Sequence, residues 1–299
     1  MGLVSTLHHK VRTTPWLGRF ALQAIPDLRW HVSVEPVGKF EIRLRRNRGY
    51  WLRSPLSNDG FMMGALTRLI KPGDVIYDIG ANIGLYSRFL VQKFQASRVY
   101  AFEPAQANRP QLARNLVFGD CSEKVTIMPL AVGDEDGSTE FQVDDISSHA
   151  GTLNAVTHGG ASSSRSQYNL PPVSETVQVR RLDSLIQDEN MKLPNVMKID
   201  IEGAEAMALR GGMKLLRERG PNLVIELHGA PVAVEVLKVL LECDYHCFGY
   251  LETSAGTYYK ELEASDLPLI TGKYSLHFVA ASKRADDLIA PITDPEWIH

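Results

Sequence analysis

The sequence predicts an α/β protein with a mainly parallel sheet and helices on both of its faces. Short apolar runs typical of strands alternate with segments of helical spacing along most of the chain. Several of these runs end in an acid or a histidine, at the edge where ligands bind in parallel sheets. The chain has 299 residues, 44% of them hydrophobic, which is enough for the core of such a sheet.

The order of elements follows from the pattern of apolar residues. Runs rich in Val, Ile and aromatic residues predict strands at 75–78, 99–102, 125–132, 138–143, 177–181, 196–200, 223–227, 246–250 and 275–280. Apolar residues at helical spacing predict helices at 85–94, 105–118, 204–217 and 232–241. Residues 144–176 contain much Ser, Gly and Asn and show no clear period, so we expect a long loop over the site.

The most informative segment is the first strand with the turn that follows it. Residues 75–84 read Val-Ile-Tyr-Asp-Ile-Gly-Ala-Asn-Ile-Gly, which predicts a strand, a tight turn and the start of a helix. Glycines let a ligand approach the backbone, and a helix N-terminus offers free N–H groups. The next strand ends in Glu103, where an acid can accept hydrogen bonds from both hydroxyls of a ribose. Together these features predict a nucleoside cofactor.

The spacing of the glycines argues against a dinucleotide. The dinucleotide fingerprint is Gly-x-Gly-x-x-Gly, whereas this turn reads Asp-x-Gly-x-x-x-Gly, with Asn82 in place of the second glycine. The carboxylate of Asp78 would repel a pyrophosphate but suits a cationic amino-acid group. S-adenosylmethionine (SAM) carries a ribose, an ammonium and a sulfonium and has no phosphate. The turn therefore resembles that of a class I SAM-dependent methyltransferase, although Asp78 could also serve only to cap the turn.

A second run places three carboxylates at another junction between a strand and a helix. It reads Lys-Ile-Asp-Ile-Glu-Gly-Ala-Glu over residues 198–205. With the first turn, Phe-Glu-Pro at 102–104 and Leu-Ala-Val-Gly-Asp at 130–134, it resembles the FkbM family of methyltransferases, in which Lys-Ile-Asp-x-Glu-Gly-x-Glu is a hallmark. The resemblance covers about residues 57–281.

The resemblance implies a Rossmann-like class I methyltransferase sheet of seven mostly parallel strands with an antiparallel last strand. It implies SAM as cofactor and methyl transfer to a hydroxyl of a sugar, glycolipid or natural product. In this interpretation the first turn cradles the methionine end of SAM and Glu103 holds the ribose. The residues expected to bind the cofactor are Asp78, Gly80, Ala81, Asn82, Gly84, Glu103, Pro104 and Ala131.

Methylation of a hydroxyl requires a group that accepts its proton. We expect Asp200, Glu202 and His228 to be the catalytic residues, because Asp200 and His228 follow predicted strands and Glu202 lies close to Asp200. Glu205 is a further candidate for the base, or it favours the N-terminus of the next helix. By ligand type Asp200, Glu226 and His228 could hold a divalent metal, although the spacing does not demand one. His149 and His158 in the long loop could reach the acceptor.

Charge divides the chain into two regions. Residues 1–56 carry a net charge of +7 and form a basic N-terminal extension with a predicted strand pair, whereas residues 57–299, the expected methyltransferase domain, carry −10. The basic residues 43–53 could contact an anionic partner, but alternation with Phe40, Ile42 and Leu44 favours a solvated strand face. The acidic domain would repel a phosphate backbone, so a nucleic-acid acceptor is not expected.

Other properties limit the functional classes. No apolar run is long enough for a membrane span, no secretory signal is visible, and the three cysteines suggest neither disulfides nor zinc, so we expect a cytoplasmic protein. The strand pair could serve a homodimer. Two alternatives to the methyltransferase stay open at this point. One is an NAD-linked oxidoreductase, which NAD binding would reveal. The other is a non-catalytic module that binds SAM without transferring its methyl group.

Overall fold

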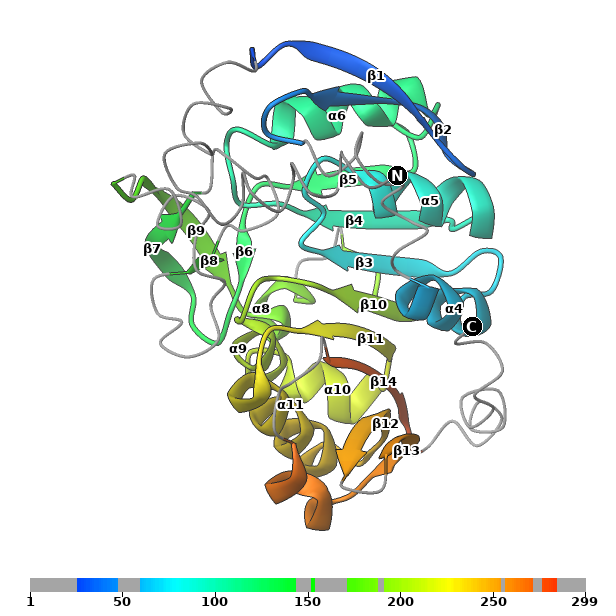
Figure 1. Cartoon of the computed structure of the whole chain (residues 1–299), viewed down its shortest axis with the longest axis vertical. Coiled ribbons are helices and arrows are strands. Elements are labelled where there is room, and N and C mark those ends of the chain that lie inside the picture. Colours follow the sequence, from blue (N-terminus) through cyan, green and yellow to red (C-terminus); the bar gives the residue numbers. More distant parts are fainter. Residues whose placement is uncertain are drawn as a thin grey trace.

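The structure of the chain is a computed structural model. It describes residues 26–47, 60–143, 152–153, 171–187, 191–253, 256–270 and 276–283. Its centre is an eight-stranded sheet in the order β13-β12-β14-β11-β10-β3-β4-β5 (Figure 1). The strands are β3 (Val75–Ile79), β4 (Arg98–Phe102), β5 (Val125–Met128), β10 (Val196–Ile199), β11 (Asn222–Leu227), β12 (Tyr245–Thr253), β13 (Gly256–Leu262) and β14 (Leu276–Ser282).

The directions of the strands confirm the predicted fold class. β3, β4, β5, β10 and β11 are parallel to one another, whereas β14 is antiparallel to both β11 and β12. These are the strand directions expected from the resemblance, with one addition. β13 extends the edge beyond the seven expected strands by pairing antiparallel with β12, to which residues 254–255 connect it. So short a link favours a hairpin.

Helices cover both faces of the sheet. On one face α4 (Gly60–Leu69), α5 (Leu85–Phe94) and α6 (Arg109–Phe118) share an apolar core with the sheet. On the other face a second core contains α8 (Leu182–Leu185), α9 (Glu205–Arg210), α10 (Met213–Arg219) and α11 (Ala230–Glu242). A 3₁₀ turn at Ala264–Leu269 follows β13. None of the helices in the described ranges is both long and apolar enough to cross a membrane.

Two elements predicted as continuous are divided in the structure. The predicted strand at 125–132 becomes β5 in the central sheet and β6 (Ala131–Val132) in another sheet. Pro129 lies at the break, and its missing N–H prevents it from donating to the ladder. The predicted helix at 204–217 becomes α9 and α10, separated by Gly211 and Gly212. A Cβ on Gly211 would lie 1.9 Å from the carbonyl oxygen of Gly133, so this backbone contact requires glycine.

A smaller sheet lies beside the carboxyl ends of the parallel strands (Figure 1). Its order is β6-β9-β7-β8, with β7 (Gly137–Gln142), β8 (Thr152–Leu153) and β9 (Ser174–Arg180). β8 and the first residues of β9 lie in the segment predicted as a loop, and both pair with β7. Residues 144–151 and 154–170 of that segment, with His149 and His158, lie outside the described residues.

The N-terminal part of the chain forms a hairpin of β1 (Arg29–Val34) and β2 (Gly38–Arg43). Glu41 of β2 is buried: its backbone N–H donates to Asn115 of α6 and its carboxylate pairs with Arg114. Arg88 of α5 is also buried and donates to the carbonyl oxygens of Val37 and Lys39. The hairpin is therefore joined to the main body through buried polar contacts.

Candidate cofactor and acceptor site

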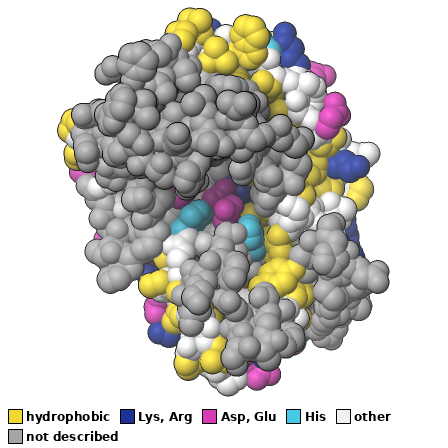
Figure 2. Space-filling model, in the orientation of Figure 1, with side chains coloured by type: hydrophobic (Ala, Val, Ile, Leu, Met, Phe, Trp, Pro, Cys, Tyr) yellow, Lys and Arg dark blue, Asp and Glu magenta, His cyan; other side chains and the backbone are white. Residues whose placement is uncertain are grey.

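A cavity of about 290 Å³ opens at the carboxyl ends of β3, β4, β10 and β11. Figure 2 shows acidic and histidine side chains gathered in a hollow near the middle of one face. The lining includes Gly80, Asn82, Glu103, Pro104, Ala131, Asp200, Glu202 and His228, which the sequence predicted as site residues. Asp78, Ala81 and Gly84, also predicted for the cofactor, do not line it.

The turn after β3 brings two chain segments close together. Gly80 has a φ of 88°, and a Cβ at this position would lie 1.9 Å from the carbonyl oxygen of Asp200. Only glycine fits both constraints. Gly84 has a φ of 90°, and a Cβ there would lie 2.4 Å from Cδ1 of Leu112, so this glycine lets α6 pack against the turn. These two glycines therefore shape the turn, but only Gly80 faces the cavity.

Glu103 follows β4 and forms one end of the site. Its carboxylate accepts hydrogen bonds from the backbone N–H groups of Asn82 (2.8 Å) and Ala105 (2.8 Å) and from the side chain of Asn108 (3.3 Å). Burial raises the pKa of Glu103, and these hydrogen bonds and the charge of Lys198 lower it. Burial has the larger effect, so the pKa is raised to about 7. The carboxylate is therefore fixed in position beside the cavity, with a pKa near neutral pH.

Asp78 lies within β3 rather than after it, and for this reason it is buried. Its partner across the sheet is Lys198 of β10, and the side chains of these two residues lie on the same face. Asp78 accepts a hydrogen bond from Ser87 (2.6 Å), and Nζ of Lys198 lies 3.4 Å from its other oxygen. Asp78 therefore acts on the cavity only through its neighbours.

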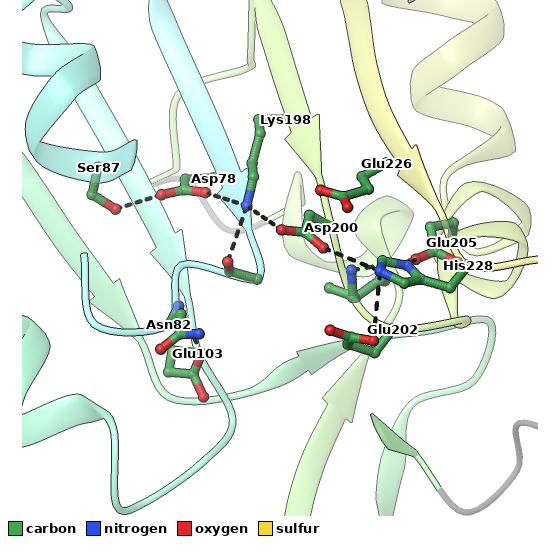
Figure 3. A network of polar contacts seen from close by, with 12 residues as sticks. Asp78, Asn82, Ser87, Glu103, Lys198, Asp200, Glu202, Glu205, Glu226 and His228 are labelled. Atoms are coloured by element: carbon green, nitrogen blue, oxygen red, sulfur yellow. Dashed lines mark hydrogen bonds and ion pairs between the residues drawn. The ribbon is translucent and has the colours of Figure 1, made fainter. Parts of the chain in front are cut away.

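Lys198 connects the two predicted motifs (Figure 3). Its buried ammonium donates to the carbonyl oxygen of Gly80 (3.1 Å) and lies 3.5 Å from the carboxylate of Asp200. Burial alone would lower the pKa of Lys198, but the charges of Asp200 and Asp78 outweigh it and hold the pKa above its usual value. Lys198 is thus a permanent cation that ties the first turn to the end of β10.

His228 follows β11 and lies among three carboxylates at the other end of the site (Figure 3). Its Nδ1 is 2.8 Å from Oε1 of Glu205, and its Nε2 is 3.5 Å from Glu202 and 3.8 Å from Asp200. Burial lowers the pKa of His228, but the hydrogen bond to Glu205 and the charges of the three carboxylates outweigh it and raise the pKa to about 10. At neutral pH His228 is therefore an imidazolium that holds these carboxylates together.

The predicted group of possible metal ligands is also close in space. Asp200, Glu226 and His228 each offer one ligand atom, and these three atoms lie within 4.8 Å of one another. Two carboxylates and an imidazole suit several divalent cations. A cation bound here would lie next to Glu202, at the end of the cavity opposite Glu103.

Four features of the site have no clear signal in the sequence. Asn108 contacts Glu103 from the start of α6, and Arg46 reaches the cavity from the segment after β2 while pairing with Asp27. The contact between Glu205 and His228 joins residues that are 23 positions apart. In addition, Phe141 of β7 and Leu153 of β8 supply an apolar wall. Except for Asn108, which is only five positions from Glu103, these residues come from segments that only the tertiary fold brings together.

Comparison with known proteins gives consistent matches. Residues 78–247 match the family model described as the methyltransferase FkbM domain. The chain is 31% identical over 176 residues to Methyltransferase 1 of Beauveria bassiana, covering 56% of this chain and 70% of that protein. It is 26% identical over 196 residues to the hexuronic acid methyltransferase AglP of Haloferax volcanii, covering 64% and 72%. It is 28% identical over 189 residues to the 31-O-demethyl-FK506 methyltransferase FkbM of Streptomyces tacrolimicus, covering 58% and 72%.

Proposed function

The chain belongs to the FkbM family of SAM-dependent methyltransferases, and we propose that it methylates a hydroxyl group of a sugar, glycolipid or natural-product acceptor. The observation that carries the proposal is a cavity whose two ends differ in chemistry. One end has a single fixed carboxylate, Glu103, and the other has the cluster around His228. Two relatives support an oxygen or sugar acceptor by their names, which specify 31-O-demethyl-FK506 and a hexuronic acid.

We assign SAM to the part of the cavity lined by the first turn and Glu103. The carboxylate of Glu103 would accept hydrogen bonds from the ribose hydroxyls while the backbone groups keep it in place. Gly80 and Asn82 line the adjoining wall, and Pro104 and Ala131 contribute further lining. Asp78, Ala81 and Gly84 would support this wall from behind, which gives them a structural role in cofactor binding.

The acceptor hydroxyl would then bind at the end lined by Asp200, Glu202 and His228. The methyl carbon of SAM is already reactive, so much of the acceleration can come from holding the hydroxyl in line with it. A carboxylate must accept the hydroxyl proton during attack. We assign this role to Asp200 or Glu202, because His228 already carries a proton at neutral pH. The imidazolium would orient the two carboxylates.

A metal-assisted version of the same reaction is favoured by the spacing of Asp200, Glu226 and His228, and in it the cation displaces the proton from Nε2 of His228. A divalent cation there would lower the pKa of a bound hydroxyl. Calorimetric titration with magnesium chloride separates the two versions. Heat of binding that the wild-type chain shows and the Glu226→Gln variant lacks supports the metal-assisted version. Full turnover in the presence of a chelator contradicts it.

The experiment that tests the proposed function is a screen of acceptors. The purified chain is incubated with SAM and a panel of methyl glycosides, hexuronides and macrolide alcohols, and S-adenosylhomocysteine and methylated product are measured by mass spectrometry. We expect product methylated at oxygen with at least one class. An Asp200→Asn variant is the matched control for background transfer. SAM binding without product from any acceptor would instead support the non-catalytic module.

A further inference from the structure

Glu205 is a buried carboxylate whose contacts exceed what a helix start requires. It is the first residue of α9 and its side chain is fully buried. One oxygen, Oε1, lies 2.8 Å from Nδ1 of His228 and accepts from the backbone N–H groups of Gly203 (3.1 Å) and Ile201 (3.4 Å). A single oxygen atom therefore joins the turn after β10 to the residue after β11.

The turn that Glu205 holds carries both proposed proton acceptors. Asp200 and Glu202 flank Ile201, and Glu202 has a φ of 55°, in the left-handed region that non-glycine residues rarely adopt. Such a conformation persists only where surrounding contacts enforce it. The hydrogen bonds from Ile201 and Gly203 to Glu205 are contacts of this kind. The directions of the Asp200 and Glu202 side chains therefore depend on Glu205.

Glu205 also decides how the imidazole of His228 is oriented. A hydrogen bond at one ring nitrogen fixes the tautomer and the direction of the other nitrogen. With Nδ1 bound to Glu205, Nε2 points toward Glu202 and Asp200 at the cavity end that all three residues line. Figure 3 shows Glu205 on the side of the ring away from these two carboxylates. Without Glu205 the ring could rotate away from the acceptor.

This arrangement has an energetic cost that a purely structural contact could avoid. Oε2 of Glu205 is buried and has no hydrogen-bond partner among the described residues. Leaving one oxygen of a buried carboxylate without a partner is unfavourable. An uncharged side chain such as Gln could bind the same backbone N–H groups without burying a charge. The contact that a glutamine oxygen would make less strongly is the one with Nδ1 of His228, 2.8 Å away, since a carboxylate is the stronger acceptor.

We propose that Glu205 is a positioning residue for methyl transfer, which holds His228 and the turn bearing Asp200 and Glu202 in the geometry that receives the acceptor hydroxyl. The role rests on the proposed function, but Glu205 itself does not touch the acceptor, since it does not line the cavity. SAM binding, which we assign to the opposite end, should not depend on it.

The test compares three variants. Glu205→Ala removes both the acceptor oxygen and the charge, and Glu205→Gln keeps an acceptor oxygen without the charge. Glu235→Gln is the matched control, because Glu235 on α11 has an exposed carboxylate that pairs with Lys238. For each variant we would measure SAM affinity by calorimetry and kcat and KM with the best acceptor of the screen. Nitrogen-15 spectra of histidine-labelled protein would report the Nδ1–H of His228, identified by its loss in His228→Gln.

We expect the Nδ1–H signal of His228 to disappear in Glu205→Ala. The kcat of this variant should fall by about 100-fold, which is the effect of displacing a reacting group by about 1 Å. Its SAM affinity should change by less than about threefold. Glu205→Gln should lose about tenfold in kcat, and Glu235→Gln should match the wild type. An unchanged kcat in Glu205→Ala, or an equal loss of SAM affinity, would overturn the role. Should Glu205→Ala fail to fold, Glu205→Gln decides through kinetics alone: a kcat equal to that of the wild type, or a loss of SAM affinity equal to the loss in kcat, overturns the role.

The spectra separate this role from the proposed function. If the wild-type chain methylates no acceptor, the proposed O-methyl transfer fails, while the Nδ1–H signal still decides the geometry. A signal that is present in the wild type and lost in Glu205→Ala supports positioning by Glu205. A signal that persists in Glu205→Ala overturns it whatever the activity.

Discussion

The two ends of the cavity are built in different ways. At the Glu103 end, the carboxylate is held by Asn82, Ala105 and Asn108, which lie within a short stretch of the chain. At the His228 end, the contacts are between charged side chains from the segments after β10 and β11. At the first end, mainly backbone N–H groups fix the carboxylate, which suits the binding of a single cofactor. The second is an electrostatic cluster, whose function depends on the charges of all its members.

The largest expected effect is the loss of turnover at the His228 end. Replacing Asp200 by Asn should reduce kcat by about 10² to 10⁴-fold, the range for a group that takes part in proton transfer. Replacing His228 by Ala removes the group that orients the two carboxylates and should reduce kcat by about 10²-fold. SAM affinity should stay within about threefold, because neither residue contacts Glu103. Steady-state kinetics and calorimetry on the same preparations check this. Intact turnover in both variants would remove the catalytic assignment.

A change at the junction should damage both ends together. In Gly80→Ala the added Cβ would lie 1.9 Å from the Asp200 carbonyl oxygen, at a φ of 88°. A strained backbone position costs about 1–3 kcal/mol, and the clash adds to this. Thermal or urea unfolding should therefore show a loss of about 3 kcal/mol, with weaker SAM binding and lower turnover. Gly73→Ala is the matched control, because Gly73 has a similar φ of 91° while a Cβ there meets nothing within 4 Å, so this variant has the backbone strain without the clash. Equal stability of the two variants would contradict the close approach.

Removing the charge of Glu103 should affect only the cofactor end. A hydrogen bond to a charged group contributes about 1.5–3 kcal/mol, so Glu103→Gln should weaken SAM binding by about 10- to 100-fold. The variant should still fold, because the glutamine oxygen can accept at least one of the backbone N–H groups. Glu175→Gln is a matched control, since the carboxylate of this half-buried residue also accepts a hydrogen bond from a backbone N–H, that of Gln106. Unchanged SAM affinity in Glu103→Gln would remove the ribose assignment.

The smallest expected effect is a dependence of SAM affinity on pH. The pKa of Glu103 is raised to about 7 by burial, and ribose hydroxyls need the ionised carboxylate as acceptor. SAM affinity should therefore be highest above pH 8 and should fall by up to about tenfold at pH 6, because Glu103 of the free chain takes up a proton in this range. In the free chain the raised pKa favours folding at low pH, and this contribution disappears as pH rises through 7. Calorimetry in buffers of different ionisation enthalpy would detect proton release on binding, and Glu103→Gln should abolish it.

The difference between the two ends also explains what the sequence could predict. The alternating strands, the turn at Gly80 and the acid after β4 are local patterns, so the fold class and the residues at the Glu103 end of the cavity could be predicted from spacing. The break near Gly211 depends on Gly133, which lies far away in the sequence, whereas β13 and the break at Pro129 are local features that the pattern of apolar residues did not reveal. Asp78 lies inside β3, one residue before the strand ends, and does not line the cavity, so its part in cofactor binding stays a prediction.

The acceptor end could be predicted only as a set of candidates. Asp200, Glu202, Glu205 and His228 were all recognisable as chemically suitable, yet their roles depend on distances between two strand ends. The position of Glu205 behind the imidazole ring follows from the packing of α9 against α11, which begins two residues after His228, and no spacing in the sequence encodes this packing. The assignment of roles to these residues remains a prediction.

The most direct test of the division between the two ends is a double-mutant cycle of Glu103→Gln and Asp200→Asn, with SAM affinity and kcat measured for all four proteins. Changes at independent sites add in free energy. If the two ends are independent, Glu103→Gln lowers SAM affinity alone, Asp200→Asn lowers kcat alone, and the double variant shows both losses in full. An Asp200→Asn variant that loses SAM affinity as strongly as Glu103→Gln would contradict the division between the two ends.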